Sequence, residues 1–310
     1  MRRVWRNTAG ASVIVATLAP LAPPVAAQVS LPPINLGDTS FLDGVAGPGG
    51  LIEETLSVGS ARSFRDGRGR KAAAPRDLTV VSALTHIAYL SHLKVFGAYW
   101  GAEIVLPVAR VALDVASGVR GRTTGTGDLF ISPVLLQWPE QQLFGRPFWQ
   151  RLNLDVTVPT GRYSNRRLVN AGGNVVHVNP HYAFTWMASD TWDVSGRLHY
   201  LWVSTNTDPP DSLGARSIQP GQALHANLSL SREVVDGLRL GLSGYVLQQI
   251  TSDWIDGVAQ KRSRERVVGI GPAVQWRIDR TTLTANAYWE TAARDRPEQV
   301  RVLLRFGRTF

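Results

Sequence analysis

The residues best suited to metal binding or catalysis are six histidines, because the chain contains no cysteine. Without cysteine, disulfides, thiolate metal sites and a cysteine nucleophile are excluded. His177 and His181 are four residues apart. In a strand, this spacing puts both side chains on one face but about 13 Å apart. That distance is too long for two ligands of one metal ion, so the sequence predicts no metal site and no cofactor.

The rest of the chain carries no motif of a known catalytic reaction. It lacks the Gly-Lys-Ser/Thr of phosphate-binding loops, the HExxH of zinc peptidases and the GxSxG of serine hydrolases. The run 121–127 is rich in glycine and threonine, but no helix is expected after it, so phosphate binding is not predicted. No catalytic residue is therefore assigned.

The chain begins with an export signal, which precedes the elements that position the polar residues. Three arginines in the first six residues precede a small, apolar run over 8–21, and Val25-Ala26-Ala27 supplies small residues before a cleavage point at Gln28. Prolines within 20–24 argue against a spanning helix. We predict a signal peptide over 1–27. Its removal takes three arginines and no acid, so the formal net charge falls from +9 to +6.

The remainder of the chain is dominated by an alternation of apolar and polar residues. In 223–231, for example, leucine or alanine alternates with His225, Asn227 and Ser229. Such a period of two gives each strand one apolar and one polar face. Twelve segments of this kind are predicted as strands: 51–62, 77–89, 98–114, 126–138, 150–160, 174–188, 191–204, 220–232, 237–252, 264–277, 281–292 and 299–310.

The connections between these strands alternate in length. Those after odd-numbered strands are long or polar, whereas 189–190, 233–236 and 278–280 after even-numbered strands are short. Long outer loops, short periplasmic turns and an even strand number are typical of outer-membrane barrels. The connection 139–149 is long for a periplasmic turn and fits the pattern least well.

These patterns predict an all-β fold. We expect a transmembrane antiparallel β-barrel of about twelve strands over 51–310, in a Gram-negative outer membrane, with both termini periplasmic. The Pro/Gly-rich leader 28–50 is expected to be irregular and is a candidate plug of the lumen. The terminal Phe310 is in phase with the apolar side chains of the last strand, a pattern that the barrel assembly machinery would recognise.

The polar face of the strands supplies the candidate binding residues. Charged groups inside a barrel must be paired or hydrated, so these side chains either line a water path or form an arginine–carboxylate ladder that braces the wall. The predicted lumen-lining residues are Asp155, Asn179, His181, Asp193, Arg197, His199, His225, Asn227, Arg239, Asn286, Glu290, Arg301 and Arg305.

The basic excess suggests contacts outside the barrel as well. The first long loop holds six basic residues between 62 and 76, which could contact lipopolysaccharide phosphates or simply remain solvated. Nucleic-acid binding is disfavoured, because the basic residues are spread along the chain without an aromatic-lined groove. The expected partners are outer-membrane lipid, lipopolysaccharide and a small solute.

Several short strings occur in order along the chain: Gly127-Asp128-Leu129, Ser132-Pro133, Pro159-Thr160-Gly161-Arg162-Tyr163, Gly173-Asn174, Asn179-Pro180, Gln248-Gln249 with Asp253, Gly269-Ile270-Gly271-Pro272, and Glu290 followed by 292–297. Taken together, they resemble the outer-membrane family of "meta-pathway of phenol degradation" transporters. The chain departs from the family pattern at Asp295 and after Pro297, in the predicted last outer loop. The resemblance implies a barrel that takes up hydrophobic or aromatic compounds, with no catalytic residue.

The expected function is therefore passive passage of small apolar or aromatic solutes through the outer membrane. Two alternatives remain open. A lipid-acting enzyme would need a serine–histidine pair at the lipid face, and a structural barrel would have a lumen closed by side chains.

Overall fold

The computed structural model describes residues 29–39, 41–72, 76–115 and 118–310. The predicted signal peptide lies outside these residues. Within the described part of the chain, no helix is long and apolar enough to cross a membrane. The one helical element among the described residues is a short 3₁₀ turn, η1 (Asp211–Leu213).

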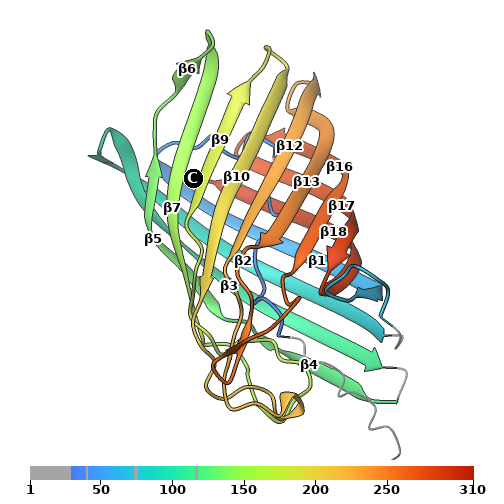
Figure 1. The fold of residues 1–310 in the computed structure, drawn as a ribbon. Coiled ribbons are helices and arrows are strands. Elements are labelled where there is room, and N and C mark those ends of the chain that lie inside the picture. Colours follow the sequence, from blue (N-terminus) through green and yellow to red (C-terminus); the bar gives the residue numbers. More distant parts are fainter. Residues whose placement is uncertain (1–28, 40, 73–75, 116–117) are drawn as a thin grey trace, which may run out of the picture.

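Twelve long antiparallel strands form a closed barrel, which confirms the predicted fold class (Figure 1). The barrel closes because β1 pairs with β18 on one side and with β2 on the other. The wall strands are β1 (Gly49–Arg65), β2 (Arg76–Val95), β3 (Ala98–Val115), β5 (Leu129–Gln137), β7 (Arg146–Val158), β9 (His181–Met187), β10 (Trp192–Val203), β12 (Ala223–Val235), β13 (Leu238–Gln249), β16 (Arg266–Ile278), β17 (Thr281–Arg294) and β18 (Arg296–Thr309).

The wall is apolar outside and polar inside. On β12, Leu224, Leu228 and Leu230 are exposed, whereas His225 and Asn227 are buried. The same inversion recurs along most of the wall, because neighbouring side chains of a strand point to opposite faces. The strands β2 and β3 differ, since many of their inward side chains are also apolar. An exposed band of leucine, valine and isoleucine is stable only against lipid, so the protein belongs in the outer membrane.

The two ends of the barrel differ as the sequence predicts. Tight turns such as Phe96-Gly97 and Asp236-Gly237 lie at one end, and the long loops gather at the other, which is the lower end in Figure 1. The long connection after β5 contains β6 (Gln141–Leu143), which pairs with the start of β7. This hairpin projects past the wall at the short-turn end, which explains the length of 139–149.

Small strands occupy the loops at the opposite end. They are β4 (Arg120–Thr126), β8 (His177–Val178), β11 (Ile218–Gln219), β14 (Trp254–Ile255) and β15 (Val258–Ala259). The strand β4 pairs with the outer part of β3, beyond the point where β5 begins. The strands β11, β14 and β15 form a separate small sheet.

Two predicted strand boundaries are wrong. The segment 174–188 is not continuous: it divides into β8 and β9 around Asn179-Pro180, because proline has no amide hydrogen to donate to a neighbouring strand. The predicted last outer loop is also too long. The strands β17 and β18 are separated only by Asp295, whose φ of 51° makes the turn.

A positive charge placed on the outer face tests the membrane position of the wall. Leu228, at the middle of β12, is 47% exposed, and Val235, at the end of the same strand, is 60% exposed. We expect Leu228→Arg to lower the free energy of unfolding in phospholipid vesicles by about 2–4 kcal/mol, but Val235→Arg by only about 0–1 kcal/mol. Denaturant titration in vesicles measures both, and a larger cost at Val235 would contradict the placement.

Candidate functional site

The lumen contains the N-terminal segment, described over 29–39 and 41–48, which lies along its inner wall. Its backbone is held by polar side chains from several strands. The Gly37 amide donates to Asn227 Oδ1 at 2.8 Å, the Tyr288 hydroxyl donates to the Gly37 carbonyl at 2.9 Å, and the Gly44 amide donates to Thr185 Oγ1 at 2.8 Å. The segment therefore uses the wall side chains as the hydrogen-bonding partners that its irregular backbone requires.

The strongest contact between this segment and the wall is an ion pair. Arg197 on β10 donates from Nε and Nη2 to the two carboxylate oxygens of Asp43 at 2.5 and 2.6 Å. Arg151 on β7 approaches the same carboxylate at 3.7 Å and donates to the Asp43 carbonyl at 3.1 Å. The Asp43 side chain is 3% exposed, so its charge depends on these arginines for compensation.

The segment runs from the long-loop end of the lumen towards the short-turn end. The Leu31 amide donates to Glu265 Oε1, next to the start of β16, while Gly44 meets β9 and the chain then enters β1. The expectation that both chain ends lie on the periplasmic side is therefore wrong for the first described residues. Arg301 and Arg305, which donate to the Leu36 and Asp38 carbonyls at 2.8 Å, hold this path in place.

A cavity of about 1280 Å³ remains between the segment and one side of the wall. On the segment, Leu31, Ile34 and Phe41 border it, and on β1 and β18 its lining is mostly polar. Its lining reaches Asp128 at the long-loop end and Arg280 at the short-turn end. The inward side chains of β2 and β3 that face it are mostly apolar, and the polar exceptions are Ser82 and the pair formed by His86 and Glu103, whose Nε2 and Oε2 atoms lie 3.1 Å apart. The apolar side chains are Leu78, Val80, Leu84, Ala88, Leu90, Val105, Pro107, Ala109 and Val111.

The predicted lumen residues lie on strands, except Asn179, which lies between β8 and β9. Eleven of the thirteen are buried, and Arg197 and Arg301 are partly buried. They form separate groups rather than one ladder. Asn227, Arg197, Arg301 and Arg305 hold the N-terminal segment, while Asn286 donates to Ser243 Oγ. Glu290 accepts from the Tyr245 hydroxyl at 2.8 Å.

A second ion pair lies inside the wall near the short-turn end. Arg239 on β13 donates to Asp193 on β10 at 2.8 Å and to Glu233 at 3.0 Å. Ser195 and Ser231 also donate to the Asp193 carboxylate. This group braces three neighbouring strands and is the part of the lumen that best matches the predicted arginine–carboxylate ladder.

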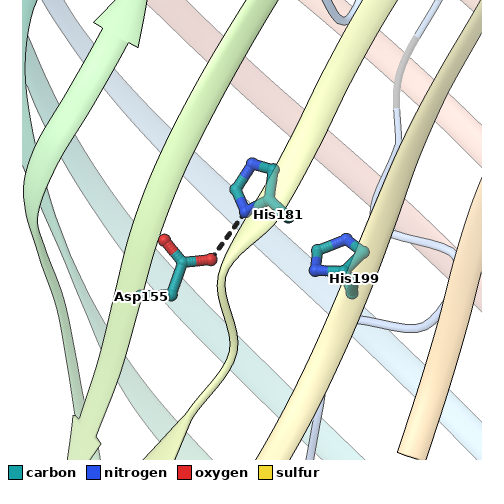
Figure 2. A group of neighbouring side chains, drawn as sticks. All are labelled: Asp155, His181 and His199. Carbon is teal, nitrogen blue, oxygen red and sulfur yellow. Dashed lines mark hydrogen bonds and ion pairs between the residues drawn. The ribbon is translucent and has the colours of Figure 1, made fainter.

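The histidines form a cluster that spacing along one strand did not reveal. His181 Nδ1 lies 2.7 Å from Asp155 Oδ2, and the His199 ring lies 4.7 Å from that of His181 and 4.1 Å from that of His225 (Figure 2). One ligand atom each from Asp155, His181 and His199 lies within 4.8 Å of the other two. The expectation of no metal ligands considered His177 with His181 and overlooked the neighbours across the strands.

The outer loops are tied together by a carboxylate whose role the sequence did not indicate. Asp128, which precedes β5, accepts from the Gly161 amide at 2.8 Å and from the Gly173 amide at 2.6 Å. A side chain at Gly161 would lie 2.6 Å from the Gly127 backbone, so glycine is needed there. Three of the strings that carry the family resemblance thus meet at one point of the barrel mouth.

Comparison with known proteins agrees with this fold. Residues 61–306 match the family described as "Putative MetA-pathway of phenol degradation". The chain belongs to this family. The match covers most of the barrel and begins within β1, after the segment that enters the lumen. Comparison with curated proteins gives no match.

Solved structures with a similar fold are outer-membrane barrels. The COG4313 outer membrane channel from Pseudomonas putida F1 superposes with a TM-score of 0.75 at 21% identity, over 86% of this chain and 97% of that chain. The beta domain of the Bordetella autotransporter BrkA gives a TM-score of 0.51 at 14% identity, over 85% and 100%. The transport unit of AIDA-I from Escherichia coli gives 0.53 at 10% identity, over 85% and 90%. These likenesses establish the barrel fold.

A small side chain tests how closely the N-terminal segment is seated. A Cβ at Gly44 would lie 2.4 Å from the Thr185 amide nitrogen, whereas a Cβ at Gly47 would meet nothing within 4 Å. We expect Gly44→Ala to cost about 1–3 kcal/mol of unfolding free energy and to speed amide hydrogen exchange over 36–46. Gly47→Ala is the matched control and should leave both unchanged. Equal exchange in the two variants would show that the segment does not bind the wall at Gly44.

A second test uses the pH dependence of the outer loops. Burial raises the pKa of the Asp253 carboxyl to about 7, although the Gly221 amide and Gln249 donate to it. Burial and the charge of Asp66 raise the pKa of Asp295 to about 6. Because these values lie above the ordinary 3.8, the fold favours the protonated carboxyls. The stability they contribute is complete below about pH 4 and is lost as pH rises through about 7.

We therefore expect hydrogen exchange over 250–264, corrected for its intrinsic pH dependence, to quicken between pH 5 and pH 8. Asp253→Asn removes this titration and should flatten most of the pH dependence. If hydrogen exchange over 250–264 depends on pH in the same way in Asp253→Asn and in the unchanged protein, the Asp253 carboxyl does not control the stability of the loop.

Proposed function

We propose that this barrel lets small apolar solutes, aromatic compounds in particular, cross the outer membrane by passive diffusion. The observation that carries the proposal is the cavity beside the N-terminal segment. An aqueous pore for sugars or ions would be lined by polar groups, but here β2 and β3 turn apolar side chains inward as well as outward. Membership of a family described by phenol degradation fits the same solute class.

The path would follow the apolar strip. A solute would enter among the outer loops near Asp128, pass between the N-terminal segment and the inward side chains of β2 and β3, and leave near Arg280. Contact with the apolar strip removes water from the surface of the solute. Because water solvates apolar surface poorly, the strip favours apolar over polar solutes. No energy source is needed, because the solute moves down its own concentration gradient.

The ends of the barrel suggest its further partners. Arg62, Arg68 and Lys71 are exposed in or beside the first long loop, where they would meet lipopolysaccharide phosphates. At the other end, Phe310 is 63% exposed, and its backbone exchanges two hydrogen bonds of 3.0 Å with Gly50. This exposed terminal aromatic would be available to the barrel assembly machinery.

A channel is favoured over a lipid-acting enzyme. Within the described part of the chain, the hydrogen bonds of histidine side chains go to carboxylates or an amide: His86 to Glu103, His181 to Asp155, and His225 to Asn179. A serine nucleophile needs a histidine within hydrogen-bond reach. These histidine pairs do not include a serine, which disfavours acyl transfer.

Uptake into proteoliposomes tests this function. We expect phenol and benzoate to enter faster than a sugar of similar size. Val105→Asp places a charge on the apolar strip and should slow the aromatic solutes about tenfold, since a ring face of roughly 60 Å² at about 25 cal/mol per Å² is worth about 1.5 kcal/mol.

Ser57→Asp is the matched control, because it adds the same charge to the polar side of the same cavity. It should leave aromatic uptake within a factor of two. Equal entry of sugar and aromatic solutes, or no entry of either, would contradict the proposed function, and the second result would indicate a structural barrel.

A further inference from the structure

Four polar side chains that solute passage does not require lie together on four neighbouring strands. They are Asp155 on β7, His181 on β9, His199 on β10 and His225 on β12. His199 lies directly opposite His181 on one side and His225 on the other. None is more than 3% exposed. Their meeting is thus a product of strand register and not of proximity in the sequence.

The hydrogen bonds of this cluster leave several buried polar atoms without a partner among the described residues. Because a carboxylate only accepts, the short contact fixes the proton of His181 on Nδ1, where it is donated to Asp155 Oδ2. Among the described residues, the other Asp155 oxygen, His181 Nε2 and both ring nitrogens of His199 have no partner. A neutral imidazole always carries one donor and one lone pair. Burying His199 with its N–H donor and its lone pair both without a partner costs free energy, unless another group binds the lone pair.

We propose that Asp155, His181 and His199 form a binding site for a divalent first-row transition-metal ion. Their ligand atoms lie within 4.8 Å of one another, and side-chain adjustment must bring each to about 2.0–2.2 Å from the ion. Figure 2 shows the Asp155 carboxylate, the Nδ1 edge of His181 and one ring nitrogen of His199 around a common point. The His225 ring stacks on His199 at 10°, so it positions that ring rather than providing a ligand.

Proton and charge balance are compatible with this site. When the ion binds at His181 Nδ1, the proton of that nitrogen moves to Nε2, and the imidazole stays neutral. The Asp155 carboxylate supplies one negative charge. Arg197, two residues from His199 on β10, is engaged by both carboxylate oxygens of Asp43, which compensates its positive charge.

The donor set identifies the class of ion. Two imidazoles and one carboxylate suit Zn²⁺, Co²⁺ or Fe²⁺, whereas Ca²⁺ and Mg²⁺ require mainly oxygen ligands. Three protein ligands leave at least one coordination position for water or a solute oxygen. His181 lines the large cavity, so the ion reaches the site through the lumen and can contact a solute there.

Metal titration of the full-length barrel, without an affinity tag and after chelator treatment, tests the proposal. We expect one equivalent of Co²⁺ per chain, with visible absorption bands, and displacement by Zn²⁺ but not by excess Ca²⁺. His199→Ala, His199→Gln and His181→Ala should each weaken binding by about 100-fold or more. A heat-modifiable band on gel electrophoresis checks that each variant has folded.

His177→Ala is the matched control, because His177 is also a buried histidine of the lumen wall but lies outside the cluster. It should bind Co²⁺ as tightly as the unchanged protein. The proposal is overturned if the unchanged protein binds no Co²⁺, if folded His199→Gln binds as tightly as the unchanged protein, or if His177→Ala is weakened equally. Solute uptake does not enter this test, so its result is independent of the proposed function.

Discussion

The whole structure depends on one constraint: each wall strand has a lipid face that must be apolar, so nearly every charged group of the wall has to be accommodated in the lumen. Those charges need partners there, and the N-terminal segment supplies many of them. Asp43 meets Arg197, and the Leu36 and Asp38 carbonyls meet Arg301 and Arg305. In return, an irregular segment that has no strand to pair with obtains hydrogen bonds for its own backbone. The segment and the polar wall thus depend on each other.

This arrangement divides the lumen into two unlike sides. Strands β7 to β13 and β16 to β18 carry most of the polar groups that hold the segment, while β2 and β3 turn apolar side chains inward and border the cavity. A solute therefore meets an apolar strip rather than a uniformly polar pore. The buried histidines lie beside the cavity on the polar side, where a bound ion would be shielded from lipid and still reachable from the lumen.

The sequence predicted the barrel well because period two is a local property. The alternation in 223–231 identifies both the existence of β12 and the faces of its residues without reference to any other strand. This local pattern could not predict features that depend on how neighbouring strands are aligned. The contact of His199 with His181 and His225 requires the register across two connections, and the path of 29–48 has no periodicity from which it could be read. Asn179-Pro180 belongs to one of the motifs that carry the family resemblance. The break that it makes between β8 and β9 was not predicted, because the effect of the missing proline amide hydrogen depends on how the neighbouring strands pair.

The N-terminal segment occupies the lumen and narrows it. Single-channel conductance in planar bilayers, comparing the full barrel with a variant lacking residues 30–47, tests that claim most directly. We expect small or undetectable ion conductance for the full barrel and a large, steady conductance for the folded deletion variant. Equal conductance of the two proteins would contradict it, because the segment would then not limit the pore.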